Sequence, residues 1–200
     1  MKTIILLVFL AITSCNKDSV KQDPAAQLPP ETQTGANTFG VTINGKVYIP
    51  RDPTGVNVGP SGRGMKFKGS STLPWNEIYV IDGASAVGFQ IVIHFKNLLP
   101  QATGLYTLKN SNFQDGLDSD LIDHIYFKIW DSSISNYAYY GSVEDQGKIN
   151  VNKFDGNPLW ILSGTFEGKF VRNDNPNEFI TINDGRFDLN LNTLPNAKFP

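Results

Sequence analysis

The chain has 200 residues, and its 17 Lys and Arg against 19 Asp and Glu give a formal net charge of −2. This length fits one ordinary domain, and the balanced charge excludes both a basic nucleic-acid-binding protein and an acidic disordered tail. The single Cys excludes a disulfide framework and a Cys-based zinc cluster, and the presence of only two His argues against a His-rich metal site. The 18 Gly and 12 Pro argue against a helical bundle.

The first 14 residues have the composition of an export signal. Lys2 supplies a positive charge, and residues 4–12 form an unbroken apolar run. Nine residues span about 14 Å as a helix, whereas a transmembrane helix must cross roughly 30 Å of hydrocarbon. Residues 1–14 are therefore predicted to be a signal peptide and not a membrane span.

The end of this signal resembles the bacterial lipobox. Residues 12–15 read Ile-Thr-Ser-Cys, an aliphatic residue and two small residues followed by a cysteine. The resemblance implies that the Cys15 thiol takes a diacylglyceryl group and that the chain is cut before Cys15. Two or three acyl chains give stable membrane anchoring, so the expected first partner is a membrane. The alternative is an ordinary secretory signal with an incidental cysteine.

Residues 15–37 are predicted to be the lipidated cysteine and a disordered tether. The segment is rich in Lys, Asp, Gln, Pro, Ala and Thr, with almost nothing to bury. As a flexible coil, its roughly 22 residues would hold the domain about 25–30 Å from the anchor. Lys17 and Asp18 resemble the charged signals that send some Bacteroidota lipoproteins to the outer face. We expect an outer-membrane lipoprotein that faces either the periplasm or the cell surface.

Residues 38–200 are predicted to form a single all-β domain. Apolar residues recur with a period of two, and Gly, Pro, Asn or Asp separate most of the runs. Asn44 and Gly45 predict a two-residue hairpin turn. Antiparallel strands in this number favour either a β-sandwich or a partly open barrel, and periodicity does not choose between them. The strands are expected at 38–43, 46–49, 77–81, 87–96, 105–108, 125–130, 137–140, 148–154, 159–171, 179–182 and 186–191.

The residues that could perform catalysis do not form a set. Ser85 lies in a sequence similar to a hydrolase nucleophile elbow, but the second Gly comes one residue late and a strand follows. His94 is expected on the solvated face of its strand. His124 follows Asp123 directly, and neighbouring residues of a strand point to opposite faces. A secreted hydrolase is therefore a disfavoured alternative, and no catalytic residue or cofactor is predicted.

Calcium binding is the second chemical option, because four Asp lie between residues 115 and 123. Calcium prefers several oxygen ligands from one flexible loop. The spacing misses the EF-hand pattern by one residue and lacks its distal Glu. A solvated acidic loop is the favoured interpretation, and calcium binding is left open.

The candidate ligand-binding residues are aromatic. Tyr126, Lys128 and Trp130 share one face of their predicted strand, and pairing with the next strand would add Tyr137 and Tyr139. Exposed aromatic rings stack on sugars or rest on protein partners, so a glycan or an envelope protein is the expected ligand. Trp75 is a further candidate contact. The alternative is that a loop or a second sheet covers these rings.

Four motifs together resemble a Bacteroidota lipoprotein family of unknown function. They are Thr-Gly-Ala-Asn-Thr-Phe-Gly at 34–40, Asn-Gly-Lys at 44–46, Ser-Gly-Thr-Phe-Glu-Gly at 163–168 and Asp-Gly-Arg-Phe-Asp at 184–188. The family supplies no activity and no site residues, and the motifs are interpreted as folding signals. The expected function is that of a lipid-anchored, non-catalytic binding domain, with a structural subunit of an envelope assembly as the alternative.

Overall fold

The computed structural model describes residues 27–55, 59–69, 73–118, 120–156 and 158–200. The first 26 residues, which include the predicted signal peptide and Cys15, lie outside the described residues. The described strands are β1 (Thr38–Ile43), β2 (Lys46–Tyr48), β3 (Met65–Gly69), β4 (Asn76–Ile81), β5 (Gln90–Phe95), β6 (Gly104–Thr107), β7 (His124–Asp131), β8 (Asn136–Asp155), β9 (Ile161–Arg172) and β10 (Phe179–Asn190). The described helical segments are η2 (Pro60–Gly62), α1 (Leu98–Gln101), η3 (Gly116–Asp118) and η4 (Leu194–Asn196).

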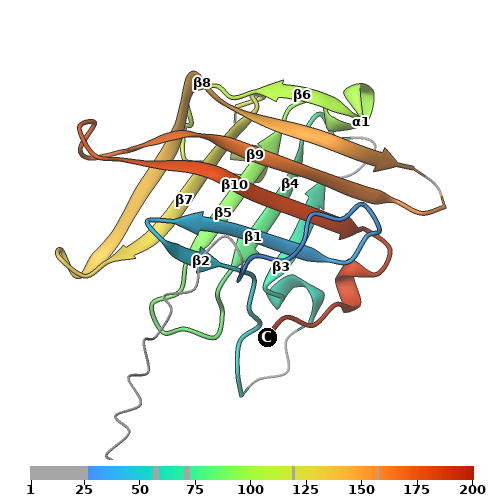
Figure 1. Ribbon diagram of the computed structural model, residues 1–200, viewed down its shortest axis with the longest axis horizontal. Helices are drawn as coiled ribbons and strands as arrows, with labels where there is room; N and C mark the ends of the chain where they lie inside the picture. Colours follow the sequence, from blue (N-terminus) through green and yellow to red (C-terminus); the bar gives the residue numbers. More distant parts are fainter. Residues whose placement is uncertain (1–26, 56–58, 70–72, 119, 157) are drawn as a thin grey trace, which may run out of the picture.

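The described strands belong to one curled sheet (Figure 1). Their order is β2-β1-β10-β9-β8-β7-β5-β4-β3, and β6 pairs with β8 beside this path. Every strand pair is antiparallel. The prediction of an antiparallel all-β fold is confirmed, and of its two alternatives the sheet takes the partly open barrel, curling into a half-barrel.

The first hairpin agrees with the prediction from its turn residues. β1 has the predicted bounds, and the turn that follows places Asn44 at φ 50° and Gly45 at φ 75°. A type I′ turn requires positive φ at both central residues, which Asn and Gly tolerate.

Other strands differ from the prediction. Two pairs of predicted strands form single long strands, β8 and β10, and the pairing register shifts within each of them. β3 was not predicted, because its five residues include two Lys and a Gly.

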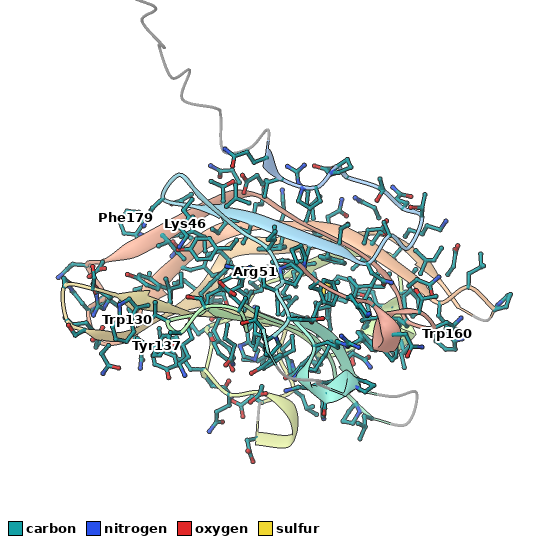
Figure 2. The ribbon with its side chains drawn as sticks, turned by 90° about the horizontal axis from the view of Figure 1, so that it is seen from below. Lys46, Arg51, Trp130, Tyr137, Trp160 and Phe179 are labelled. Atoms are coloured by element: carbon teal, nitrogen blue, oxygen red, sulfur yellow. The ribbon has the colours of Figure 1, made fainter. Side chains whose placement is uncertain are left out.

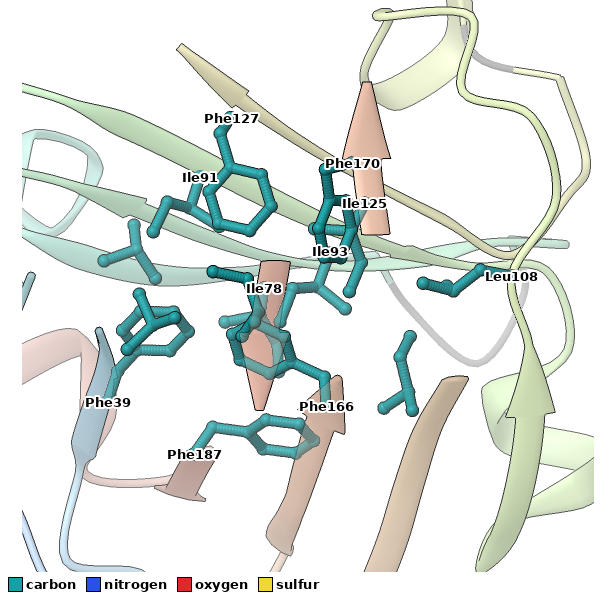
Figure 3. Close-up of a cluster of buried hydrophobic side chains, with 14 of the residues drawn as sticks. Phe39, Ile78, Ile91, Ile93, Leu108, Ile125, Phe127, Phe166, Phe170 and Phe187 are labelled. Carbon is teal, nitrogen blue, oxygen red and sulfur yellow. The ribbon is translucent and has the colours of Figure 1, made fainter. Parts of the chain in front are cut away.

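The core lies on the concave side of the half-barrel (Figure 3). Phe127 and Phe170 meet edge to face with ring centroids 4.8 Å apart, and Phe39 and Phe166 stack at 5.8 Å. Aromatic pairs with these geometries add to the stabilisation from apolar burial. Because side chains alternate along a strand, the neighbours of these residues lie on the convex side, which the following section calls the outer face.

The prediction of a free tether over residues 15–37 is wrong for residues 27–37. Leu28 is buried, and Thr32, Gly35 and Ala36 donate hydrogen bonds to the carboxylate of Asp188 in β10. The polar composition of this segment suggested solvation, but its donors are matched to an acceptor more than 150 residues away in sequence. The folded domain therefore includes residues from 27 onward.

Candidate functional site

Four of the six predicted contact residues form one cluster on the outer face of the β7–β8 hairpin. The two strands pair as predicted, and the register places Lys128 opposite Tyr139 and Trp130 opposite Tyr137. The rings of Trp130 and Tyr137 meet edge to face at 5.4 Å (Figure 2). The Lys128 ammonium nitrogen lies 4.5 Å from the centroid of the Tyr137 ring and 5.8 Å from that of Tyr139. We call Lys128, Trp130, Tyr137 and Tyr139 the outer strip.

The outer strip is partly open to solvent. Tyr139 is 36% exposed, and the other three side chains are half-buried. The Lys128 ammonium group and the tyrosine rings stabilise one another's positions, since a cation over an aromatic face is attracted by the ring quadrupole. The arrangement offers ring faces for stacking and one ammonium group for hydrogen bonding or charge pairing.

Tyr126 and Trp75, the other two predicted contacts, are not on the surface. Tyr126 is only 3% exposed, because Phe113 packs beside its ring and Gln90 donates a hydrogen bond to its hydroxyl oxygen. Trp75 is 7% exposed and stacks on His94. The expectation that they form surface contacts is wrong, because a loop covers this part of the outer face.

A polar pocket of about 360 Å³ opens at the same end of the half-barrel. It lies between the β1–β2 turn, the β7–β8 hairpin and the strands β9 and β10, and Trp130 lines it. Sequence reasoning did not find this pocket, because its walls come from four separate stretches of chain. Its lining residues are Ile43, Asn44, Tyr48, Ile129, Trp130, Asp131, Ser132, Ser133, Ala138, Tyr140, Arg172, Glu178 and Ile180.

Arg172 organises the polar wall of the pocket. Its Nη1 lies 2.8 Å from Asp131 and 3.0 Å from Glu178, and its Nε donates to Asp174. Hydrogen bonds from Ser133 and then from Arg172 lower the pKa of Asp131. These bonds occupy the guanidinium group, so the pocket wall presents carboxylate and hydroxyl oxygens more than free cationic donors.

Tyr140 completes this wall. Its hydroxyl donates a 2.6 Å hydrogen bond to Glu178. Burial, and then this hydrogen bond to a carboxylate, raise the pKa of Tyr140 to about 12. Tyr140 therefore stays protonated at neutral pH and acts as a hydrogen-bond donor.

The residues of the disfavoured hydrolase lie in different environments. Asp82 accepts the backbone N–H of Ser85, as in an ordinary turn, and the Ser85 hydroxyl accepts the N–H of Val87. The expectation of a solvated His94 is wrong: its side chain is fully buried and its Nδ1 lies 2.8 Å from the carbonyl oxygen of Ile122. The structure does not bring Ser85 and His94 into hydrogen-bond contact.

The acidic loop is only partly solvated. Asp115 forms an ion pair with Lys68, and the Asp123 carboxylate accepts the backbone N–H of Lys96. Among the residues with described positions, no group of three or more His, Cys, Asp or Glu side chains is arranged to hold a metal ion. Two of the Asp are thus used to attach the loop to the sheet.

Three of the four motifs converge on one buried carboxylate. Asp188, in the last motif, is 1% exposed. It accepts backbone N–H bonds from Gly35 and Ala36 of the first motif and a 2.5 Å bond from the hydroxyl of Ser163. This geometry supports the interpretation of the motifs as folding signals. We call Asp188 and its donors the Asp188 clamp.

Comparisons of the chain with protein-family models, with curated proteins and with solved structures found no match. Among the described residues, every helical segment is too short or too polar to cross a bilayer. The outer strip and the adjacent pocket are therefore candidate binding sites on the basis of their geometry alone.

Proposed function

We propose that this protein is a lipid-anchored cell-envelope lipoprotein whose β domain binds a partner without catalysis. The outer strip is the observation that supports binding: three aromatic rings and a lysine lie together on one hairpin, partly open to solvent. The favoured ligand is an envelope glycan, because ring faces stack on sugars while an ammonium group pairs with hydroxyl or carboxylate groups. An envelope protein is the alternative ligand.

The Asp188 clamp changes how far such an anchor would hold the domain from the membrane. The clamp attaches residues 32–36 to β10, and the described chain begins at residue 27. The 11 residues 16–26 separate Cys15 from that point. A chain extends by at most about 3.6 Å per residue, so the maximum reach falls from about 80 Å for the predicted 22 residues to about 40 Å for these 11.

Replacing Cys15 tests the anchor. In cells grown with a labelled fatty acid, the wild-type protein is expected to carry the label and to sediment with membranes. Cys15→Ala removes the only thiol, so the variant should lose both the label and membrane association. Retention of both by Cys15→Ala would contradict the proposal.

Replacing Trp130 tests the binding site. We expect Trp130→Ala to weaken binding of the purified domain to its ligand on a glycan array by about tenfold or more, because it removes a central aromatic contact. Trp160→Ala is the matched control, since Trp160 lies at the opposite end of the molecule from Trp130 in Figure 2. Equal binding by wild type and Trp130→Ala, with unchanged thermal melting, would exclude the outer strip as the glycan site.

A further inference from the structure

A row of buried titratable side chains crosses three neighbouring strands on the outer face. Glu77 in β4 pairs with His94 in β5, and His94 pairs with His124 in β7. All three residues are fully buried. The two imidazole rings lie 5.1 Å apart, centroid to centroid. Their position opposite the core means that something other than the sheet must cover them.

The chain between β6 and β7 is hydrogen-bonded to each member of the row. Ser111 is hydrogen-bonded to Nδ1 of His124 at 2.9 Å, and the backbone N–H of Gly116 donates to Glu77 at 2.6 Å. The carbonyl oxygen of Ile122 lies 2.8 Å from Nδ1 of His94. Residues 109–116 therefore lie over the row, held by bonds to two of its three titratable groups, while Ile122 is bonded to the third.

The hydrogen bonding and burial of His94 fit a neutral imidazole ring. A carbonyl oxygen only accepts hydrogen bonds, so Nδ1 of His94 carries the proton and its Nε2 presents a lone pair. This Nε2 and Oε2 of Glu77 are both buried without a hydrogen-bond partner. Buried polar atoms of this kind are unusual and costly. Both are acceptors, so the row as a whole can take up protons.

Among the described residues, the charges at the row are the Glu77 carboxylate and the ion pair of Lys68 with Asp115. Lys68 from β3 pairs with Asp115 and also lies 3.7 Å from Glu77. Lys68 offsets much of the charge of Asp115, and within the row itself one carboxylate, that of Glu77, faces two imidazole rings. Tyr126, the next outer-face residue of β7 after His124, is neutral because burial raises the pKa of its phenol. Protonating both histidines would leave like charges side by side in a buried site.

We propose that Glu77, His94 and His124 form an acid-sensitive latch. At mildly acidic pH the histidines take up protons from solvent, residues 109–116 loosen from the sheet, and Trp75 and Tyr126 become exposed. This inference rests on the buried row and its cover, and it is independent of the outer strip and of the lipid anchor.

The direction of the pH effect follows from linkage. Burial, and then the neighbouring His94, lower the pKa of His124 to about 3. Burial also lowers the pKa of His94, and it outweighs the hydrogen bond to Ile122 and the charge of Asp115, which both act to raise that pKa. With a reference pKa of about 6.5 in the open state, the closed state is fully favoured above that value and loses this advantage as the pH falls. For His124 alone, acidification from pH 7.5 to pH 5 raises the opening equilibrium about 30-fold.

The nearby carboxyl groups act in the opposite direction. Burial raises the pKa of Glu77 and of Asp123, which accepts the backbone N–H of Lys96. A carboxyl group whose pKa is higher in the closed state favours closure as the pH falls. Opening in acid is therefore assigned to the histidines.

Hydrogen exchange tests the latch. Exchange rates of the whole soluble domain are measured at pH 7.5 and pH 5 and corrected for the intrinsic pH dependence of exchange. Protection of the Ser111 and Gly116 amides, whose N–H groups donate to Ser142 and Glu77, is expected to fall at least about tenfold at pH 5. The amides of β9 and β10 should stay protected. Unchanged protection of Ser111 and Gly116 would overturn the proposal.

Two matched variants separate the histidines from other acid effects. Asn places a polar atom near the position of the histidine Nδ1, so His94→Asn and His124→Asn preserve the bonds to Ile122 and Ser111 while removing titration. The double variant should lose the pH response, whereas Glu77→Gln should keep it. If the double variant fails to fold, His124→Asn alone must reduce the response. Loss of the response in Glu77→Gln, or its full persistence in the histidine variants, would overturn the latch.

Discussion

Asp188→Ala is expected to lower the free energy of unfolding by about 4 kcal/mol or more, as measured by urea denaturation. The Asp188 carboxylate is buried and accepts bonds from the hydroxyls of Thr32 and Ser163 and from the N–H groups of Gly35 and Ala36. Hydrogen bonds to charged groups contribute roughly 1.5–3 kcal/mol each, and they are not additive. Alanine removes the acceptor and leaves several donors without a partner.

Asp184→Ala is the matched control for the Asp188 clamp. Asp184 lies in the same strand, and its side chain accepts one bond, from the N–H of Thr42. Its removal should cost only about 1 kcal/mol. Limited proteolysis gives a second measurement: cleavage near residues 27–37 should accelerate in Asp188→Ala and not in Asp184→Ala. Equal stability losses in the two variants would contradict the assignment of Asp188 as the central acceptor.

The Asp188 clamp also predicts a pH dependence. Burial acts to raise the pKa of Asp188, but the bonds from Ser163, Thr32, Ala36 and Gly35 together lower it below its usual value. A carboxyl group with a lowered folded-state pKa stabilises the fold above its unfolded pKa and loses that contribution as the pH falls through the folded value. The stability difference between wild type and Asp188→Ala should therefore shrink below about pH 4.

Phe127→Ala is expected to cost about 3–5 kcal/mol in the same denaturation experiment. Phe127 is fully buried in the concave core and meets Phe170 edge to face (Figure 3). Truncation removes the apolar contact and leaves a cavity that the surrounding strands fill only in part. A large loss locates Phe127 in the core of the half-barrel.

Lys128→Ala, one residue further along β7, is the control for Phe127→Ala. Lys128 lies on the outer face, where its ammonium group contacts aromatic rings. Its removal should change the stability by no more than about 0.5 kcal/mol. Similar losses for the two variants would mean that β7 does not have one core face and one outer face.

The strands could be predicted because their signals are local. The period of two predicted one apolar face for Val87, Phe89, Ile91, Ile93 and Phe95. The last four are buried, whereas Val87, which precedes β5, is exposed. The Asn44–Gly45 turn was predicted from two residues whose backbone preferences are intrinsic. The same local reasoning predicted that the strand of Tyr137 and Tyr139 pairs with the strand of Trp130, because a short loop joins them, and the structure gives the register.

Which aromatic side chains are exposed could not be predicted in the same way. Tyr126 and Trp130 share one face of β7, yet Tyr126 is buried and Trp130 is partly exposed. The difference comes from residues 109–116, whose Phe113 packs beside Tyr126. A strand pattern specifies which residues share a face, but not which loop covers that face.

The residues of this chain specify an antiparallel all-β domain and the face on which most strand residues lie, because alternation and turn preference act over a few neighbouring residues. The three-dimensional fold determined that residues 27–37 are held by Asp188, that the two histidines are buried, and that one end of the half-barrel carries the outer strip beside a polar pocket. Each of these features requires groups far apart in sequence to meet. Their burial and hydrogen bonding therefore depend on how the sheet curls and where its loops return.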